Sequence, residues 1–116
     1  MSYRIEERDG YSVVCLEGQF LGGDETDNLS VFFKAIDKEN NRKFIIDFEK
    51  VTYISSIVIG ILVRFHNEIV DDGGRVAVIK VSPAIMEVFR ITRVDMTLSV
   101  FQTFEEAVSY LNKDNS

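Results

Sequence analysis

Two apolar stretches with a pair of serines between them stand in the middle of the sequence and constrain its fold most strongly. The first, residues 44–48, is short and typical of a buried strand. The second, residues 57–70, is too long for an ordinary strand and becomes polar on one side, which favours a helix. Asp72, Gly73 and Gly74 then form a helix stop. We therefore expect the chain to run from a central strand into a buried helix.

The serine pair, Ser55 and Ser56, lies just before this predicted helix. A serine hydroxyl there can accept a hydrogen bond from a free amide of the first turn, so the pair has a structural explanation as a helix cap. A hydroxyl at the end of a sheet can also serve as a phosphorylation site, because the helix dipole favours an added negative charge. The residues alone leave both interpretations open.

The sequence before this region predicts a hairpin and a helix. Residues 3–8 alternate apolar and polar side chains, Asp9 and Gly10 supply a turn, and residues 11–16 continue as a more buried strand. A helix is expected to follow, with acids in its first turn, an apolar stripe at helical spacing and a stop at two asparagines. These residues are Asp24, Glu25 and Asp27, then Leu29, Phe32, Phe33 and Ile36, then Asn40 and Asn41.

The rest of the sequence predicts two further strand–helix units, each with a helix-start signal. One signal is a serine followed by proline, and the other is a Thr-x-x-Glu capping box. The elements are a strand at residues 75–81, a helix from Ser82 and Pro83, a strand at residues 98–101 and a helix from Thr103 and Glu106.

This order, with helices between successive strands, predicts the α/β fold class. Strands joined by helices pair in parallel, whereas the N-terminal hairpin is antiparallel. We expect residues 1–116 to form a single domain with a mostly parallel central sheet and about four helices. A chain of 116 residues is long enough for one core and too short for two.

The composition argues against several classes of function. The formal net charge is −6 and no dense cluster of lysine and arginine is present, which disfavours binding to nucleic acid and to anionic membranes. The first residues have no signal-peptide core, and no apolar run is long enough to span a bilayer. We expect a soluble cytoplasmic protein that is a monomer or a weak dimer.

Residues for metal or nucleophilic chemistry are also lacking. Cys15 is the only cysteine and lies in an apolar strand pattern, where a small core residue is expected; His66 is the only histidine. Neither has a ligand at metal-binding spacing, and no nucleophile stands in an activating context. We therefore expect no metal, no cofactor and no enzymatic activity.

From Asp47 to Gly60 the sequence resembles, without a gap, the signature of STAS domains of the anti-sigma-factor antagonist type. The matching positions are an aspartate, a valine, an aromatic–aliphatic pair, a serine and an aliphatic–glycine pair, here Asp47, Val51, Tyr53-Ile54, Ser56 and Ile59-Gly60. Three of the six core positions, 55–60, depart from the family pattern. Ser55 replaces an aspartate, Ile57 a second serine and Val58 a glycine. The resemblance extends over nearly the whole chain and implies a STAS-like fold.

The resemblance implies a regulatory binding protein. In the family, the unphosphorylated antagonist captures a serine kinase that is also an anti-sigma factor, and phosphorylation releases it. The acceptor falls on Ser56, with Ser55 as the alternative, and a PP2C-type phosphatase is a further implied partner. The implied partner-binding residues are Asp24, Ser55, Ser56, Ile57 and Val58. Asp24 would match the acid of the loop before the first helix, and a helix cap is its alternative role.

A second function, of another class, is a STAS scaffold that is never phosphorylated or a module that binds a small ligand. Ile57 and Val58 favour it, because they make the rim of the site more apolar and stiffer than a serine and a glycine would. A response-regulator receiver is the nearest α/β alternative, but no acidic pair follows an early strand.

Overall fold

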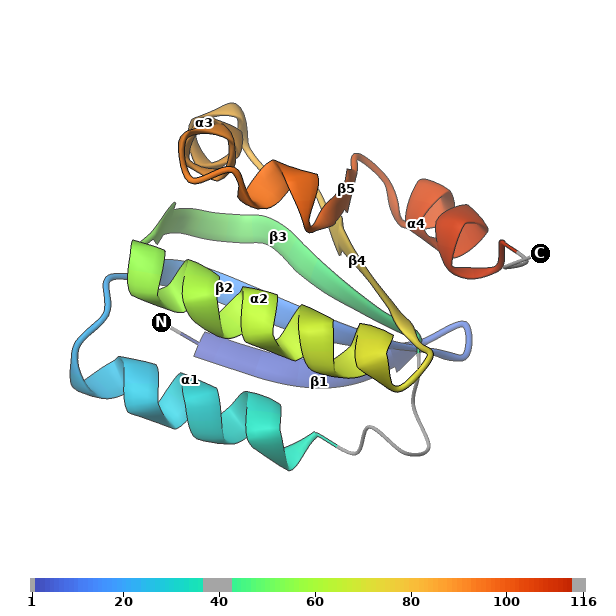
Figure 1. Ribbon diagram of the computed structural model, residues 1–116, viewed down its shortest axis with the longest axis horizontal. Helices are drawn as coiled ribbons and strands as arrows, with labels where there is room; N and C mark the ends of the chain where they lie inside the picture. The colour runs from blue at the N-terminus through green and yellow to red at the C-terminus, as the bar shows by residue number, and fades with distance from the viewer. Residues whose placement is uncertain (1, 37–42, 114–116) are drawn as a thin grey trace.

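The computed structural model describes residues 2–36 and 43–113, and Figure 1 shows how its elements are arranged. The elements are β1 (Ser2–Arg8), β2 (Tyr11–Phe20), α1 (Asp24–Ala35), β3 (Lys43–Ile54), α2 (Ser56–Asp71), β4 (Arg75–Ile79), α3 (Pro83–Ile91), the 3-10 helix η1 (Val94–Met96), β5 (Ser99–Phe101) and α4 (Phe104–Leu111). Apart from η1, which the sequence did not predict, this is the expected order of strands and helices.

Within the described residues, five strands form one sheet in the order β1-β2-β3-β4-β5. β1 and β2 are antiparallel, and the turn between them places Asp9 and Gly10 at positive φ. The other neighbouring strands are parallel, as their helical connections require. The predicted α/β fold with an antiparallel N-terminal hairpin is confirmed.

Alternating side chains along the strands build two apolar clusters, one on each face of the sheet. Val14 and Ile46 belong to the larger cluster, which α1, α2 and α3 complete. Val13, Cys15 and Ile45 point to the other face and belong to the smaller cluster, which α4 completes. Figure 1 shows α1 and α2 running along one side of the sheet. Cys15 is buried, as the sequence predicts.

Two strands are longer than the sequence predicts, and this difference positions the functional region. β2 runs to Phe20 and β3 to Ile54, whereas the sequence predicts ends near residues 16 and 48. The added pairs include Phe20 with Ile54 and follow two register shifts between the strands. Such shifts interrupt the alternation from which a strand is recognised in a sequence. The extension brings the end of β2 beside the start of α2.

The signals at the helix starts are confirmed in α3 and α4. Ser82 Oγ accepts the N–H of Ile85 at 3.3 Å, and Pro83 is the first residue of α3. Thr103 and Glu106 form both hydrogen bonds of the capping box. Local sequence therefore determines where these two helices begin.

The predicted C-terminal ends of one strand and one helix are not confirmed in the same way. β4 ends at Ile79, two residues before the predicted end at Val81, and Lys80 then takes a positive φ of 59°. α1 ends at Ala35, and the predicted stop at Asn40 and Asn41 lies outside the described residues. Neither difference changes the topology of the sheet.

Candidate functional site

Ser55 joins β3 to α2 and is held by three hydrogen bonds. Its N–H donates to the carbonyl oxygen of Phe20 at 2.8 Å, and its own carbonyl accepts the N–H of Ile59 at 3.0 Å. Its Oγ accepts the N–H of Val58 at 3.4 Å. Ser55 is thus the N-cap of α2, and the structural interpretation of this serine as a helix cap is confirmed.

Ser56 is the first residue of α2, and its side chain is exposed. The first turn of α2 contains no acidic residue, so none of its own carboxylates offsets the positive end of the helix dipole. The two adjacent serines therefore stand in different environments. The Ser55 hydroxyl caps the helix in a half-buried position, whereas the Ser56 side chain faces solvent.

The loop between β2 and α1 lies against the serine pair. Gly22 and Gly23 adopt positive φ values of 95° and 86°. A Cβ atom built on Gly22 would lie 3.5 Å from Ser55 Oγ and 3.7 Å from Thr26 Oγ1. Thr26 is buried, and its hydroxyl has no hydrogen-bond partner among the residues that the structure describes. The loop at Gly22 therefore lies beside both hydroxyls, and the positive φ of Gly22 is what favours a glycine there.

Asp24, the acid that the sequence assigns to this loop, is the first residue of α1. The N-cap position belongs to Gly23, which corrects the interpretation of Asp24 as the helix cap. The structure describes the backbone of Asp24 but not its side chain. A contact between this carboxylate and the serine pair therefore stays a prediction.

Exposed apolar side chains lie at the junction. Leu21 and Ile57, here called the apolar rim, are 62% and 61% exposed, and Tyr53, two residues before Ser55 in the sequence, is 50% exposed. Leu21 directly precedes Gly22, whose built Cβ would lie 3.9 Å from Ile57 Cδ1. The sequence identified Ile57 but missed Leu21 and Tyr53 as surface residues. Their position beside the double glycine and inside the signature could have indicated them.

Val58 has the opposite environment to its neighbour Ile57. Its side chain is completely buried in the larger cluster, so it is not part of the exposed rim. A valine at this position can affect a partner only through the packing of α2. Of the three positions that depart from the family pattern, Ser55 is half-buried and Ile57 is exposed.

Among the described residues, the candidates for metal binding or thiol chemistry are few. There, no group of three His, Cys, Asp or Glu side chains could hold a metal ion. Burial, together with the nearby carboxylate of Glu6, raises the pKa of the Cys15 thiol.

Comparison of the sequence with models of protein families identifies the family. The STAS domain model matches residues 2–107. The chain belongs to the STAS domain family. The predicted family and fold are thus confirmed, since the match spans nearly the whole sequence. Comparison with curated proteins gives no match.

Several solved structures share this STAS fold. An anti-sigma factor antagonist from Mycobacterium paratuberculosis has a TM-score of 0.82 and 21% identity, over 97% of this chain and 94% of that chain. The phosphorylated form of SpoIIAA, a Bacillus cell fate determinant, has a TM-score of 0.69 and 19% identity, over 96% of this chain and 100% of that chain. A sulfate transporter family protein from Wolinella succinogenes has a TM-score of 0.73 and 20% identity, over 90% of this chain and 86% of that chain.

At these identities the likeness concerns the fold. The similar structures include an anti-sigma factor antagonist and a sulfate transporter family protein, so the fold is shared by proteins of different kinds. No helix in the described part of this chain is long and apolar enough to cross a membrane.

Proposed function

We propose that this chain is a cytoplasmic, single-domain regulatory protein of the anti-sigma-factor antagonist type. Its unphosphorylated form binds a serine kinase that acts as an anti-sigma factor. Phosphorylation of Ser56 by that kinase ends the binding, and a phosphatase of the PP2C type restores it. The kinase supplies ATP and Mg²⁺, so the chain itself needs no cofactor and catalyses no reaction.

The observation that carries this proposal is the exposure of Ser56 next to the apolar rim. Ser56 opens α2 at the surface, and Ile57 beside it is 61% exposed. Isolated exposed apolar residues are common, but Leu21 and Ile57 both lie beside Gly22, at the junction that carries the matched signature. A partner that covers the rim would also cover the Ser56 hydroxyl.

The same geometry explains how a phosphate would act as a switch. A phosphoserine carries about −1.5 to −2 charges at neutral pH. At the start of a helix of 16 residues without acids in its first turn, this charge is compatible with the fold. The energetic cost falls on the interface instead, because a hydrated dianion would have to be buried beside Leu21 and Ile57.

The environments of the two serines favour Ser56 over Ser55 as the acceptor. The Ser55 hydroxyl accepts the N–H of Val58, and the loop at Gly22 lies over it. Phosphorylation there would disturb the cap and require movement of the loop. The Ser56 hydroxyl can enter a kinase active site without such changes.

The test combines the full chain with its kinase partner and measures the intact mass. We expect one added phosphate, mapped by peptide analysis to Ser56. Ser56→Ala should block phosphorylation and keep partner binding, while Ser56→Asp should weaken binding. Ser55→Ala is the matched control and should still be phosphorylated. A phosphate on Ser55 would refute the residue assignment, and no phosphate on either serine would refute the switch.

Asp24 is proposed as a further contact in this switch. Asp24→Asn removes the charge but keeps the size and the hydrogen-bonding oxygen of the side chain. It should change partner affinity or the phosphorylation rate more than the melting temperature. If affinity, rate and melting temperature all equal those of the wild type, Asp24 is only a surface acid.

The second candidate is a STAS scaffold that binds its partner without phosphorylation. The exposed Ile57 favours it, because an isoleucine replaces the family's second serine in the site and enlarges its apolar surface. The similar fold of a sulfate transporter family protein shows that STAS domains also occur outside the antagonists. Stable binding of a partner with no phosphate on Ser55 or Ser56 would support this candidate.

A further inference from the structure

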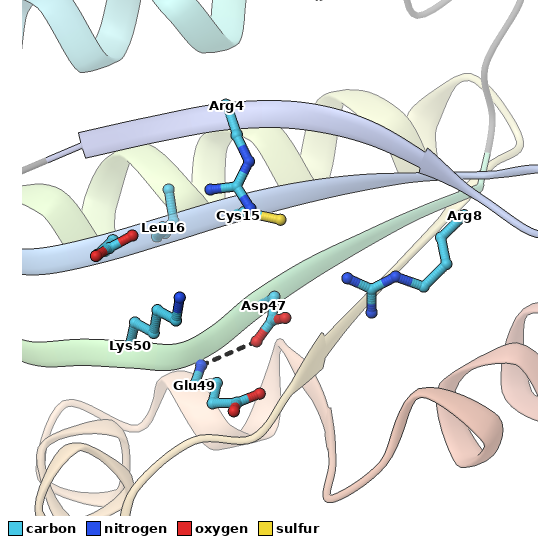
Figure 2. A pocket seen from close by; sticks show the side chains of 8 residues that line it. Arg4, Arg8, Cys15, Leu16, Asp47, Glu49 and Lys50 are labelled. Carbon is cyan, nitrogen blue, oxygen red and sulfur yellow. Dashed lines mark hydrogen bonds between the residues drawn. The ribbon is translucent and has the colours of Figure 1, made fainter.

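A charged hollow lies on the sheet face opposite α1 and α2, beside the part that α4 covers. Its volume is about 210 Å³, and its lining comes from β1, β2 and β3. Figure 2 shows Cys15 between Arg4 and Asp47, with Arg8 to the right of Asp47 and Lys50 to its left. Pockets for drug-sized ligands measure roughly 300–1,000 Å³, so this hollow suits a smaller molecule.

The hollow arises from one row of side chains across three strands. Arg4 pairs with Cys15 between β1 and β2, and Cys15 pairs with Asp47 between β2 and β3. These side chains point to the same face, and the Cα atoms of Arg4 and Asp47 are about 10 Å apart by the usual strand spacing. The small Cys15 side chain between the charged side chains of Arg4 and Asp47 leaves the space open.

Several of the charged groups at the hollow are held in place. The Arg8 guanidinium bonds to Glu6 and lies 5.3 Å from the ring centroid of Phe104 in α4. Asp47 Oδ1 accepts the N–H of Glu49 at 2.9 Å, which fixes its carboxylate. Groups held in this way lose little freedom when they bind a ligand.

The distribution of charge indicates what kind of ligand fits. The lining holds three cations and three acids, so its formal net charge is zero. The guanidinium groups come from β1, whereas Asp47 lies on β3 and is half-buried, which reduces the screening of its charge. A ligand with a single charge would be attracted by the lining groups of opposite charge and repelled by those of the same charge. A ligand with both charges, separated, can satisfy both sides.

We propose that this hollow binds a small zwitterion of the size of a free amino acid. Its carboxylate faces the guanidinium groups of Arg4 and Arg8. Each of them donates one N–H to Glu6 and, as a fork of five donors, has further N–H groups that suit a carboxylate. Its ammonium group faces Asp47, and its apolar part lies over Cys15. The proposal concerns a different face from Ser56 and does not rest on the phosphorylation switch.

The test is a titration of the ¹⁵N-labelled full chain with L-glutamine up to tens of millimolar, followed by NMR. We expect saturable shifts at the amides of Cys15 and Asp47 and none at Ser56. N-acetyl-L-glutamine, which lacks the cation, and L-glutamine methyl ester, which lacks the anion, should bind at least roughly tenfold more weakly. If either analogue binds as well as L-glutamine, the hollow is a simple ion site and the proposal fails.

Variants separate binding in the hollow from binding elsewhere. Asp47→Asn keeps the oxygen that accepts from Glu49, and Arg4→Gln changes an exposed side chain, so both should fold. Each should weaken L-glutamine binding by roughly tenfold, while Arg93→Gln, a surface control, should leave it unchanged. Cys15→Leu should abolish binding by filling the hollow, if circular dichroism shows that it folds. Binding that is absent in the wild type, or unchanged in both charge variants, would overturn the proposal.

Discussion

The amide of Ser55 donates to the carbonyl oxygen of Phe20 at 2.8 Å, and this bond ties the end of β2 to the cap of α2. Phe20 also pairs with Ile54, the last residue of β3. The loop that follows Phe20 therefore starts beside the serine pair. Two segments more than thirty residues apart in the sequence thus form one surface.

The different environments of the two serines predict different effects on stability. Ser55→Ala removes the cap of α2 and should lower the free energy of unfolding by about 0.5–2 kcal/mol. Ser56→Ala changes an exposed side chain and should change it by less than about 0.5 kcal/mol. Urea denaturation of both variants measures the difference. Equal losses would contradict the assignment of Ser55 as the cap.

Gly22 has room for a methyl group, but its backbone conformation is unfavourable for any residue other than glycine. A Cβ there would meet neighbours at 3.5 Å or more, which is ordinary contact, but the φ of Gly22 is 95°. Gly22→Ala should therefore lose about 1–2 kcal/mol of stability because its backbone conformation suits glycine. Denaturant titration checks this value. A neutral effect would mean that the loop takes another conformation with little cost, and its close approach to Ser55 would then be in doubt.

The larger cluster predicts where truncation destabilises the fold. Phe33 and Ile46 are 2% and 0% exposed, so replacing either by alanine should cost about 2–5 kcal/mol. Val31 lies on the same helix as Phe33 but is 64% exposed, and Val31→Ala should change stability by less than about 0.5 kcal/mol. A loss below about 1 kcal/mol at both buried sites would contradict the assigned faces.

The extent to which sequence predicts this fold depends on how local each signal is. The capping box at Thr103 and the Ser82-Pro83 start need only neighbouring residues, and both are found as predicted. The end of β3 depends on its register with β2, which shifts twice and which the β3 sequence alone does not contain. Its prediction near residue 48 was therefore wrong.

Burial around the candidate site is likewise a tertiary property. Ile57 and Val58 are adjacent and chemically similar, yet they are 61% and 0% exposed. Their positions on α2 relative to the sheet decide this difference, and the signature does not encode it. In the same way, the sequence shows that Leu21 and Tyr53 are apolar but not that other elements leave them uncovered.

The ion pairs on the sheet predict a weak dependence of stability on pH. A hydrogen bond from Lys80, at 2.9 Å, lowers the pKa of Glu49, and a bond from Arg8 lowers the pKa of Glu6. A carboxyl whose pKa is lower in the folded state stabilises the fold above its unfolded pKa. Stability should therefore decrease as the pH falls below about 4.3.

Glu49 is exposed and Glu6 is half-buried at the surface, so this effect should be small and should diminish with added salt. Lys80→Gln should raise the pKa of Glu49 toward its ordinary value without changing that of Glu6. Side-chain carboxyl NMR shifts followed against pH measure both groups separately. An unchanged pKa of Glu49 in this variant would show that Lys80 does not pair with it in solution.

Gly60 gives a test in which stability and partner binding should change in opposite directions. It lies within α2, and a Cβ built on it would meet nothing within 4 Å. Alanine is the better helix former, so Gly60→Ala should stabilise the isolated chain by about 0.5–1 kcal/mol. Ser56 is four residues earlier on the same helix, so both residues lie on one exposed side.

A partner that covers Ser56 should therefore also approach the backbone at Gly60, where an added methyl group would keep it away. We expect Gly60→Ala to raise the melting temperature and to weaken binding of the kinase partner, measured by calorimetry. Val31→Ala, on the exposed side of α1, is the control and should leave the affinity unchanged. Higher stability together with unchanged affinity would show that the partner does not bind on this side of α2. The phosphate on Ser56 would then need another way to end the binding.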